Sequence, residues 1–114
     1  MSIRRWEIYR ANLDPVIGSE QGKTRPVLII SEDQANEALR VVNVLPITSR
    51  KPGRRIYGNE ALLPASGGLP NESVVLAYQI RTLAKERLLV RYGQVADTRV
   101  RAEIVEALAL QLGL

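Results

Sequence analysis

Apolar and polar residues alternate or cluster along this chain in ways that predict short strands. Residues 6–10 alternate between the two types, as in a half-buried strand. Residues 26–30 and 41–48 are almost continuously apolar and rich in β-branched side chains, which is typical of central strands buried on both faces. Pro46 indicates an edge or a bulge near the end of the second run, because proline cannot donate a ladder hydrogen bond.

The second half of the chain predicts further short strands and one helix. Asp97 is suited to cap the start of that helix. Side chains at helical spacing follow it, namely Val100, Ile104, Ala107, Leu108, Gln111 and Leu112. The other expected elements are an edge strand at 56–63, a buried strand at 73–77 running on through 78–83, a helical turn at 85–88 and a strand at 90–95. Short strands closed by one amphipathic helix predict a barrel-like α+β fold.

The two apolar runs also predict a register. If they form an antiparallel pair, the connection centres near residue 36, so residues whose numbers add to about 73 face each other. Arg25, at the entrance of the first strand, then lies opposite Thr48, at the exit of the second. A guanidinium and a hydroxyl group would meet at one end of the sheet, beside the turn-rich stretch 12–23.

The composition excludes several function classes. The 114 residues suffice for a single domain, 1–114, and no apolar run is long enough to span a membrane. The chain has no Cys and no His, which excludes thiolate nucleophiles, zinc–sulfur sites and histidine acid–base catalysis. No tight acidic cluster offers a magnesium site, so we expect neither a metal nor a cofactor. The N-terminus lacks an apolar signal core, which predicts a cytoplasmic protein.

The charge balance is compatible with a polyanionic partner. Lys and Arg number 16 against 12 Asp and Glu, a net charge of +4. Such an excess suits a nucleic acid, but it is equally compatible with an ordinary charged surface. The cluster at residues 50–55 has the same two interpretations, a solvated loop or a phosphate-tracking segment.

Residues 18–25 combine two glycines with hydroxyl, amide and cationic groups. Glycines let backbone N–H groups turn toward an anion, and Arg25 can hold a phosphate through two parallel hydrogen bonds. A polar surface turn would have the same composition. The segment is not a P-loop, because the interval from Gly18 to Gly22 is one residue too short.

Three motifs follow one another along the chain, namely the ungapped stretch 13–31, the stretch 44–49, and 73–77 followed by 79–82. Together they resemble the MazF/PemK/Kid toxins, and the resemblance runs from about Arg5 to the final helix. It implies an α+β, mainly β fold, which is a compact antiparallel SH3-like barrel or twisted sheet with short helices and a C-terminal amphipathic helix. It also implies that two copies of the chain assemble as a homodimer. It also implies sequence-specific, metal-independent cleavage of single-stranded RNA (mRNA) through attack of the 2′-hydroxyl, with neutralisation by a cognate antitoxin.

The resemblance places the catalytic pair at Arg25 and Thr48, the residues that the strand register brings together. Arg25 would stabilise the charge of the transition state, and Thr48 would donate a hydrogen bond to a nonbridging oxygen. Many relatives carry a carboxylate where this chain has Tyr78, and a phenol is a poor base at neutral pH. The proton acceptor is then Glu20 or a water, while Tyr78 stacks on or hydrogen-bonds a base. The other expected RNA-binding residues are Ser19, Gln21, Lys23, Ser49, Arg50, Gln79 and Arg81.

Two alternatives come from other function classes. One is a gyrase-poisoning toxin of the CcdB type on the same fold, which would not need an Arg–Thr pair at the end of the sheet. The other is a noncatalytic RNA-binding barrel, which would usually present aromatic side chains for stacking. Aromatic residues make up only 4% of this chain, and none is Phe. Both alternatives are therefore disfavoured relative to the ribonuclease.

Overall fold

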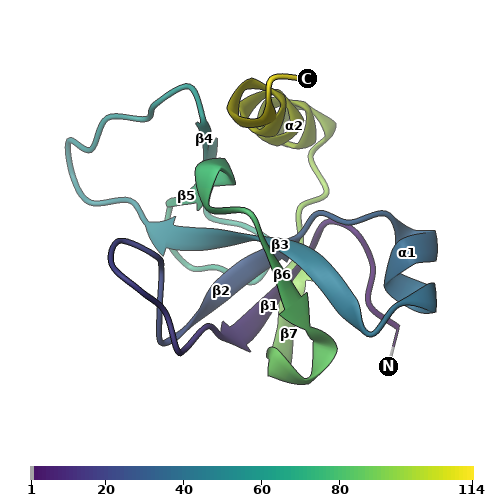
Figure 1. Cartoon of the computed structure of the whole chain (residues 1–114). Helices are drawn as coiled ribbons and strands as arrows, with labels where there is room; N and C mark the ends of the chain where they lie inside the picture. The colour runs from purple at the N-terminus through teal and green to yellow at the C-terminus, as the bar shows by residue number, and fades with distance from the viewer. Residues whose placement is uncertain (1) are drawn as a thin grey trace.

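The structure, a computed structural model, describes residues 2–114 and is dominated by antiparallel strands (Figure 1). Seven strands form a sheet in the order β4-β5-β3-β2-β1-β7, with β6 paired to β3. This confirms the predicted, mainly β α+β fold with a C-terminal helix. The elements are β1 (Glu7–Asn12), β2 (Thr24–Ile29), α1 (Asp33–Ala38), β3 (Val41–Ser49), β4 (Glu60–Leu63), β5 (Ser73–Leu76), η1 (Ala77–Gln79), β6 (Arg81–Ala84), η2 (Lys85–Arg87), β7 (Leu88–Gln94) and α2 (Thr98–Leu112).

The long strand β3 organises the sheet. One side of it pairs with β2, and the other side pairs first with β6, through Val41–Val44, and then with β5, through Ile47–Ser49. The 3₁₀ turn η1 carries the chain from β5 to β6, so the predicted continuous segment 73–83 is broken there. Pro46 lies between the two pairings, opposite Val27. The expected edge or bulge at Pro46 is therefore wrong, because β3 is central and the proline sits where β3 changes partner.

The pairing of β2 with β3 has the register predicted from the sequence. Val27 pairs with Pro46, Leu28 with Leu45, and Ile29 with Val44. Successive side chains of a strand point to opposite faces, so Leu28 and Leu45 share one face while Val27 and Ile29 share the other. All of these residues except Pro46 are 0% exposed, so both faces of the strand pair are buried, as the sequence predicts.

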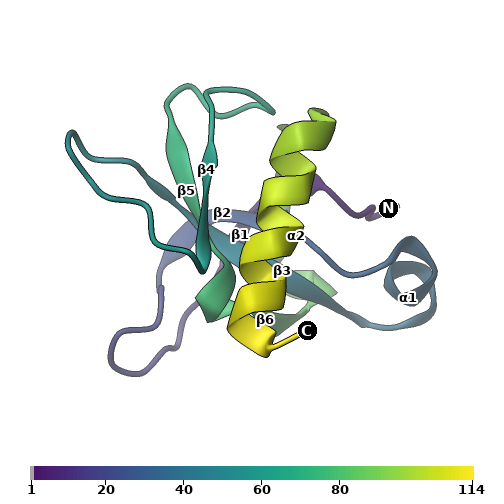
Figure 2. The same ribbon diagram turned by 90° about the horizontal axis from the view of Figure 1, so that it is seen from above.

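Two apolar clusters lie on opposite faces of the sheet. Helix α2 and the β4–β5 hairpin cover the first face (Figure 2). The first cluster is Ile8, Leu28, Ile30, Leu45, Ile47, Ala61, Leu63, Val75, Ala77, Val95, Val100, Ile104 and Ala107. The second is Ile3, Tyr9, Ala11, Leu13, Val27, Ile29, Val42, Val44, Leu83 and Leu88. Because β2 and β3 contribute side chains to both clusters, the ends of these two strands are held firmly in position.

Helix α2 begins where the sequence predicts. The Asp97 carboxylate accepts hydrogen bonds from the backbone N–H groups of Arg99 and Val100, at 2.8 and 3.4 Å. Ile104 and Ala107 are buried as expected, whereas Leu112 is 49% exposed in the last turn. The apolar stripe therefore packs on the sheet along the first three turns only. Across residues 2–114, no helix has the length and apolar character that crossing a membrane requires.

Some element boundaries differ from the sequence-based expectations. Trp6 lies outside β1 because its φ of +76° is in the left-handed region and interrupts an extended strand. Helix α1, six residues long, was not predicted. It packs beside Ser31 through Asn36, whose side-chain amide donates to the Ser31 carbonyl oxygen at 2.8 Å. A helix this short gives little periodic signal in the sequence.

Only the last four residues of the expected strand 56–63 are extended. The preceding segment turns because it is hydrogen-bonded to the buried side chain of Glu60, which is 6% exposed. Its carboxylate accepts hydrogen bonds from both terminal nitrogens of Arg54, at 2.9 and 2.7 Å, and from the backbone N–H of Tyr57 at 3.1 Å. These bonds favour the charged form, so the pKa of Glu60 lies below its ordinary value of 4.5 although burial opposes the shift.

We expect Glu60→Gln to lower the free energy of unfolding by about 1.5–3 kcal/mol at neutral pH, because a hydrogen-bonded charge is removed from a buried site. A lowered pKa in the folded state means that the stabilisation is complete above pH 4.5 and is lost as the pH falls through the folded-state pKa. The difference in unfolding free energy between Glu60→Gln and the unmodified protein, measured by urea unfolding, should therefore become smaller below about pH 4.

A matched control is Glu72→Gln, which removes an exposed carboxylate whose side chain is 48% accessible and pairs with Arg50. This substitution should lower the free energy of unfolding by less than about 1 kcal/mol. Equal losses of unfolding free energy in the two variants would contradict the role assigned to Glu60. A difference in unfolding free energy between Glu60→Gln and the unmodified protein that does not change with pH would contradict it as well.

Candidate functional site

Arg25 and Thr48 line one small pocket at the end of β2 and β3. The pocket has a volume of about 140 Å³. Arg25 and Thr48 each lie two residues beyond the pair Val27–Pro46, so strand alternation places them on the same face of the sheet. The residues that line the pocket are Arg25, Pro26, Ile47, Thr48, Ser49, Leu69, Pro70, Asn71 and Ser73. The structure thus brings together the two residues that the register predicts to meet.

The polar ends of both side chains are available for a ligand. Arg25 is half-buried, and its Nε donates to the carbonyl oxygen of Gly22 at 3.0 Å, which fixes the direction of the guanidinium. Its two terminal nitrogens and the Thr48 hydroxyl make no hydrogen bond among residues 2–114, and Arg25 makes no ion pair there. A guanidinium and a hydroxyl donor in one pocket are suited to bind the oxygens of a phosphate.

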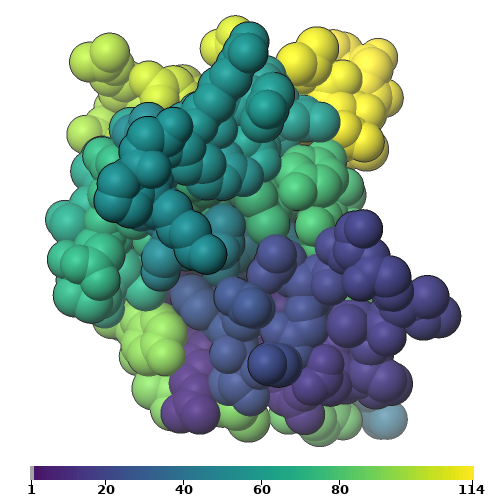
Figure 3. Space-filling view, turned by 90° about the vertical axis from the view of Figure 1, so that its left-hand side faces the viewer, coloured from purple at the N-terminus to yellow at the C-terminus, as the bar shows by residue number. Residues whose placement is uncertain are grey.

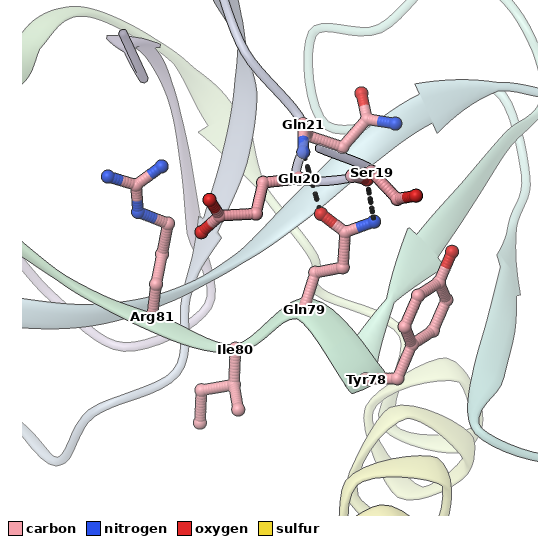
Figure 4. Close-up of a pocket in the computed structure, with 7 residues that line it drawn as sticks. All are labelled: Ser19, Glu20, Gln21, Tyr78, Gln79, Ile80 and Arg81. Carbon is pink, nitrogen blue, oxygen red and sulfur yellow. Dashed lines mark hydrogen bonds between the residues drawn. The ribbon is translucent and has the colours of Figure 1, made fainter. Parts of the chain in front are cut away.

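A second, larger pocket lies between the β1–β2 loop and the segment that follows β5 (Figure 4). Its volume is about 330 Å³. Gln79 spans the two segments, because its amide oxygen accepts from the backbone N–H of Gln21 at 2.7 Å and its amide nitrogen donates to the carbonyl oxygen of Ser19 at 3.2 Å. The lining residues are Ser19, Glu20, Gln21, Tyr78, Gln79, Ile80 and Arg81.

Two arginines add to the attachment of the β1–β2 loop. Arg81 donates from Nη1 to the carbonyl oxygen of Leu13 at 3.1 Å. Arg87 donates from Nη1 to the carbonyl oxygens of Asn12, at 3.2 Å, and Asp14. Gln79 and Arg81, which the sequence suggested for RNA contact, therefore hold the loop in place in this structure. Each still has part of its polar surface in the larger pocket.

Glu20 and Tyr78 lie apart from the Arg25–Thr48 pocket. The Glu20 carboxylate accepts a hydrogen bond from the backbone N–H of Ile17 at 2.7 Å, within its own loop. Tyr78 is 41% exposed, and in Figure 4 it lies on the opposite side of Gln79 from Arg81. Neither lines the small pocket, and no described residue lining that pocket is a carboxylate. The structure does not place Glu20, the expected proton acceptor, beside Arg25 and Thr48.

Lys23 and Arg50, two of the expected RNA-binding residues, line neither pocket. The Arg50 guanidinium bonds Glu72 at 3.0 Å and the carbonyl oxygen of Arg54 at 3.0 and 3.2 Å, so its donors are used within the protein. Lys23 is exposed in the β1–β2 loop, where its backbone N–H donates to Asp14 at 2.7 Å. Arg50 acts as a structural link in this structure, whereas the side chain of Lys23 makes no hydrogen bond or ion pair within the described residues.

Positive charge borders both pockets. The β1–β2 loop and the segment that follows β3 lie on one face of the molecule, dark blue and teal in Figure 3. Lys23 lies in the first segment and Arg25 follows it at the start of β2, while the exposed Lys51 and Arg55 belong to the second segment. None of these four makes an ion pair within residues 2–114. The face is therefore suited to a polyanion.

One wall of the small pocket was not predicted. Leu69, Pro70 and Asn71 come from the loop between β4 and β5, where the sequence predicts neither a strand nor a helix. No local pattern marks them, because the loop reaches the end of β3 only after β4 and β5 have paired. In the part of the chain that the structure describes, no three carboxylate, Cys or His side chains cluster in a way that could hold a metal ion.

The chain matches a known protein family over almost its whole length. A sequence model of the family described as "PemK-like, MazF-like toxin of type II toxin-antitoxin system" matches residues 4–112. The chain belongs to this family. This toxin is also 38% identical over 112 residues to Endoribonuclease MazF of Staphylococcus saprophyticus, an alignment that covers 98% of this chain and 92% of the relative.

Solved structures of related proteins share the fold of this toxin. MazF from Deinococcus radiodurans has a TM-score of 0.83 at 31% identity, covering 100% of this chain and 99% of that one. A mycobacterial endoribonuclease, solved in complex with its cognate antitoxin, has a TM-score of 0.79 at 28% identity, covering 98% of this chain and 96% of that one. The expected fold and family are confirmed.

Proposed function

We propose that this toxin is a sequence-specific endoribonuclease that cleaves single-stranded RNA, including mRNA, in the cytoplasm without a metal ion. Membership of the family and the likeness to Endoribonuclease MazF support the class of activity. The observation that carries the proposal is the presence of Arg25 and Thr48 in one pocket, where the terminal nitrogens of Arg25 and the Thr48 hydroxyl make no hydrogen bond among residues 2–114. Residues 1–114 act as a single toxin domain.

The reaction uses the nucleophile that RNA itself carries. The 2′-oxygen attacks the adjacent phosphorus, a 2′-oxygen–phosphorus bond forms, and the bond from phosphorus to the 5′-oxygen breaks. The products are a 2′,3′-cyclic phosphate and a 5′-hydroxyl. Arg25 stabilises the added negative charge of the phosphorane-like transition state, since a guanidinium remains ionised and presents a planar fork to phosphate oxygens. Thr48 donates a hydrogen bond to a nonbridging oxygen.

Two protons move in this reaction. The 2′-hydroxyl loses one, and we assign its acceptance to a water, with Glu20 as the second candidate. The carboxylate of Glu20 is occupied by the backbone N–H of Ile17 and lies in the larger pocket, so it reaches the 2′-hydroxyl only if the loop moves. The departing 5′-oxygen takes a proton from water, with Arg25 as the second candidate donor.

Comparison of Glu20→Gln with Tyr78→Phe separates these roles. If water accepts the proton, the rate of cleavage at saturating RNA should keep its pH dependence in both variants. Tyr78→Phe keeps the ring that stacks on a base, so it should weaken binding only by the loss of any hydrogen bond from the hydroxyl. A rate that no longer rises with pH in Glu20→Gln would assign the proton to Glu20. Loss of turnover in Tyr78→Phe with RNA binding intact would instead assign it to Tyr78. The measurement is single-turnover cleavage as a function of pH.

The larger pocket is proposed to bind the RNA on one side of the cleaved bond. Tyr78 is exposed enough to stack on a base, and stacking of this kind contributes about 1–3 kcal/mol per base. Ser49 lines the small pocket and is placed to contact the phosphate or ribose. Arg50 contributes indirectly, by holding the segment after β3. The remaining RNA-binding residues are Ser19, Gln21, Lys23, Gln79 and Arg81.

Two protein partners are part of the proposal. A cognate antitoxin neutralises the toxin, which is supported by the similar mycobacterial endoribonuclease and the Deinococcus radiodurans MazF solved with their antitoxins. A second copy of the chain forms a homodimer. Large apolar side chains on α2 and at the C-terminus are exposed and would be buried by a partner, and they are Val105 (41%), Leu110 (64%), Leu112 (49%) and Leu114 (90%).

A panel of RNAs incubated with the purified protein in excess EDTA tests the proposed activity. The expected result is cleavage at short sequences, with fragments that end in a 2′,3′-cyclic phosphate or begin with a 5′-hydroxyl, identified by mass. Fragments with 5′-phosphate ends, or a requirement for magnesium, would contradict the proposed chemistry.

A further inference from the structure

Strand β7 and the loop between β4 and β5 touch backbone to backbone through three glycines. Gly67 and Gly68, in the loop, have φ values of +62° and +90°. A Cβ on Gly67 would stand 2.7 Å from the carbonyl oxygen of Gln94, and a Cβ on Gly68 would stand 2.6 Å from the carbonyl carbon of Tyr92. Real Cβ atoms do not approach other atoms this closely. Side chains are therefore excluded on the loop side of this contact.

The strand side of the contact excludes side chains as well. A Cβ on Gly93 would stand 2.5 Å from the carbonyl carbon of Gly67. Gly93 does not have a positive φ, so its backbone is one that alanine can adopt. The close approach, and not the conformation, is what requires glycine at this position. A methyl group there would have to push the loop away from β7, because both partners are backbone.

The same loop supplies the wall of the Arg25–Thr48 pocket. Leu69, directly after the glycines, packs half-buried on the core, and its N–H donates to the Ser66 carbonyl oxygen at 3.0 Å. At the far end of the loop, the carbonyl oxygen of Glu72 accepts from the N–H of Arg50 at 3.0 Å. Pro70 and Asn71 lie between these two attachments. The glycine contact thus fixes one end of a short segment whose middle borders the candidate catalytic pair.

We propose that the contact between Gly67–Gly68 and Gly93 positions the wall formed by residues 69–71, and that this wall selects the nucleotide beside the cleaved bond. The inference rests on the proposed ribonuclease activity. Leu69 and Pro70 offer apolar surface to a base, and the Asn71 side-chain amide, which makes no hydrogen bond among the described residues, offers a donor and an acceptor to its edge. The position of the wall then determines which base fits.

Gly93→Ala tests the positioning role, with Gly58→Ala as its matched control. Gly58 also lacks a positive φ, and a Cβ there would meet only the end of the Leu110 side chain, at 2.8 Å, which can rotate away. Gly58 lines neither pocket of the site. Each protein is assayed for kcat/KM on RNAs that differ only in the nucleotides flanking the preferred cleavage position. Circular dichroism establishes that each variant is folded.

Gly93→Ala should change the ratio of kcat/KM between the preferred nucleotide and its competitors by about five- to tenfold at one flanking position, as for loss of one base contact. Gly58→Ala should leave the ratios within about twofold. Asn71→Ala should alter the nucleotide preference at the same flanking position. If Gly93→Ala does not fold, Asn71→Ala tests whether residues 69–71 select the nucleotide.

Uniform slowing on all RNAs with unchanged ratios would show a merely structural role and would overturn the inference. So would unchanged ratios in Asn71→Ala. Either result leaves the proposed activity intact, provided that the unmodified protein cleaves RNA. Failure of the unmodified protein to cleave any RNA would instead overturn the proposed function itself.

Discussion

Replacement of Arg25 by alanine should slow cleavage of RNA by about 10³- to 10⁵-fold, the range found for arginines that stabilise a phosphoryl transition state. The reason is the charge that develops on the phosphate oxygens as the 2′-oxygen attacks. Among residues 2–114, Arg25 is the one cation that lines the small pocket, and its orientation is fixed by the carbonyl oxygen of Gly22. The measurement is the single-turnover rate at saturating RNA, so that weaker binding does not enter the comparison.

Arg25→Lys distinguishes charge from geometry at this position. A lysine keeps the positive charge but lacks the planar fork, and its ammonium cannot make two parallel bonds to a phosphate. We expect it to recover only a small part of the lost rate. Full activity in Arg25→Lys would mean that the position needs charge alone, and full activity in Arg25→Ala would remove Arg25 from the catalytic machinery.

Thr48→Ala should slow the chemical step by about 10²- to 10³-fold, the cost of losing one preorganised donor to a developing oxyanion. The Thr48 hydroxyl makes no hydrogen bond within the described residues, so its removal leaves no buried partner unsatisfied. The fold should therefore tolerate the change, and thermal unfolding should move little. The effect should appear in the rate at saturating RNA and much less in the concentration of RNA needed for saturation.

Thr48→Ser serves as the control because it keeps the hydroxyl and loses only the methyl group. It should retain most of the activity, whereas Thr48→Val, which keeps the shape and loses the hydroxyl, should resemble Thr48→Ala. Equal activity in Thr48→Ser and Thr48→Val would contradict the role of the hydroxyl donor.

The sequence predicted the centre of the site because its determinants are local to two strands. Continuous apolar runs identified β2 and β3, and their antiparallel pairing about the middle of the connection gave the register that the structure shows. The Leu28–Leu45 pair formed as expected, which carried Arg25 and Thr48 to the same pocket. The family resemblance supplied the chemical roles, which residue patterns alone would not have assigned.

The periphery of the site could not be predicted in the same way. Residues 69–71 reach the pocket only through the pairing of β4 with β5, a contact that no neighbouring sequence encodes. The expected free cation at Arg50 is bonded to Glu72 and the Arg54 carbonyl oxygen, and Gln79 is bonded to the β1–β2 loop. Each is a long-range polar partnership, and such partners become visible only in three dimensions.

Arg25 and Thr48 are proposed to promote attack by the RNA's own 2′-oxygen. This proposal is tested most directly with two oligonucleotides of the preferred sequence, identical except that one has a 2′-deoxyribose directly before the cleaved phosphate. Both are incubated with the protein in excess EDTA. We expect rapid cleavage of the all-RNA strand and none at the deoxy position of the other. Equal cleavage of the two strands at that position would contradict the proposal, as would cleavage of neither strand by a protein that binds gyrase tightly.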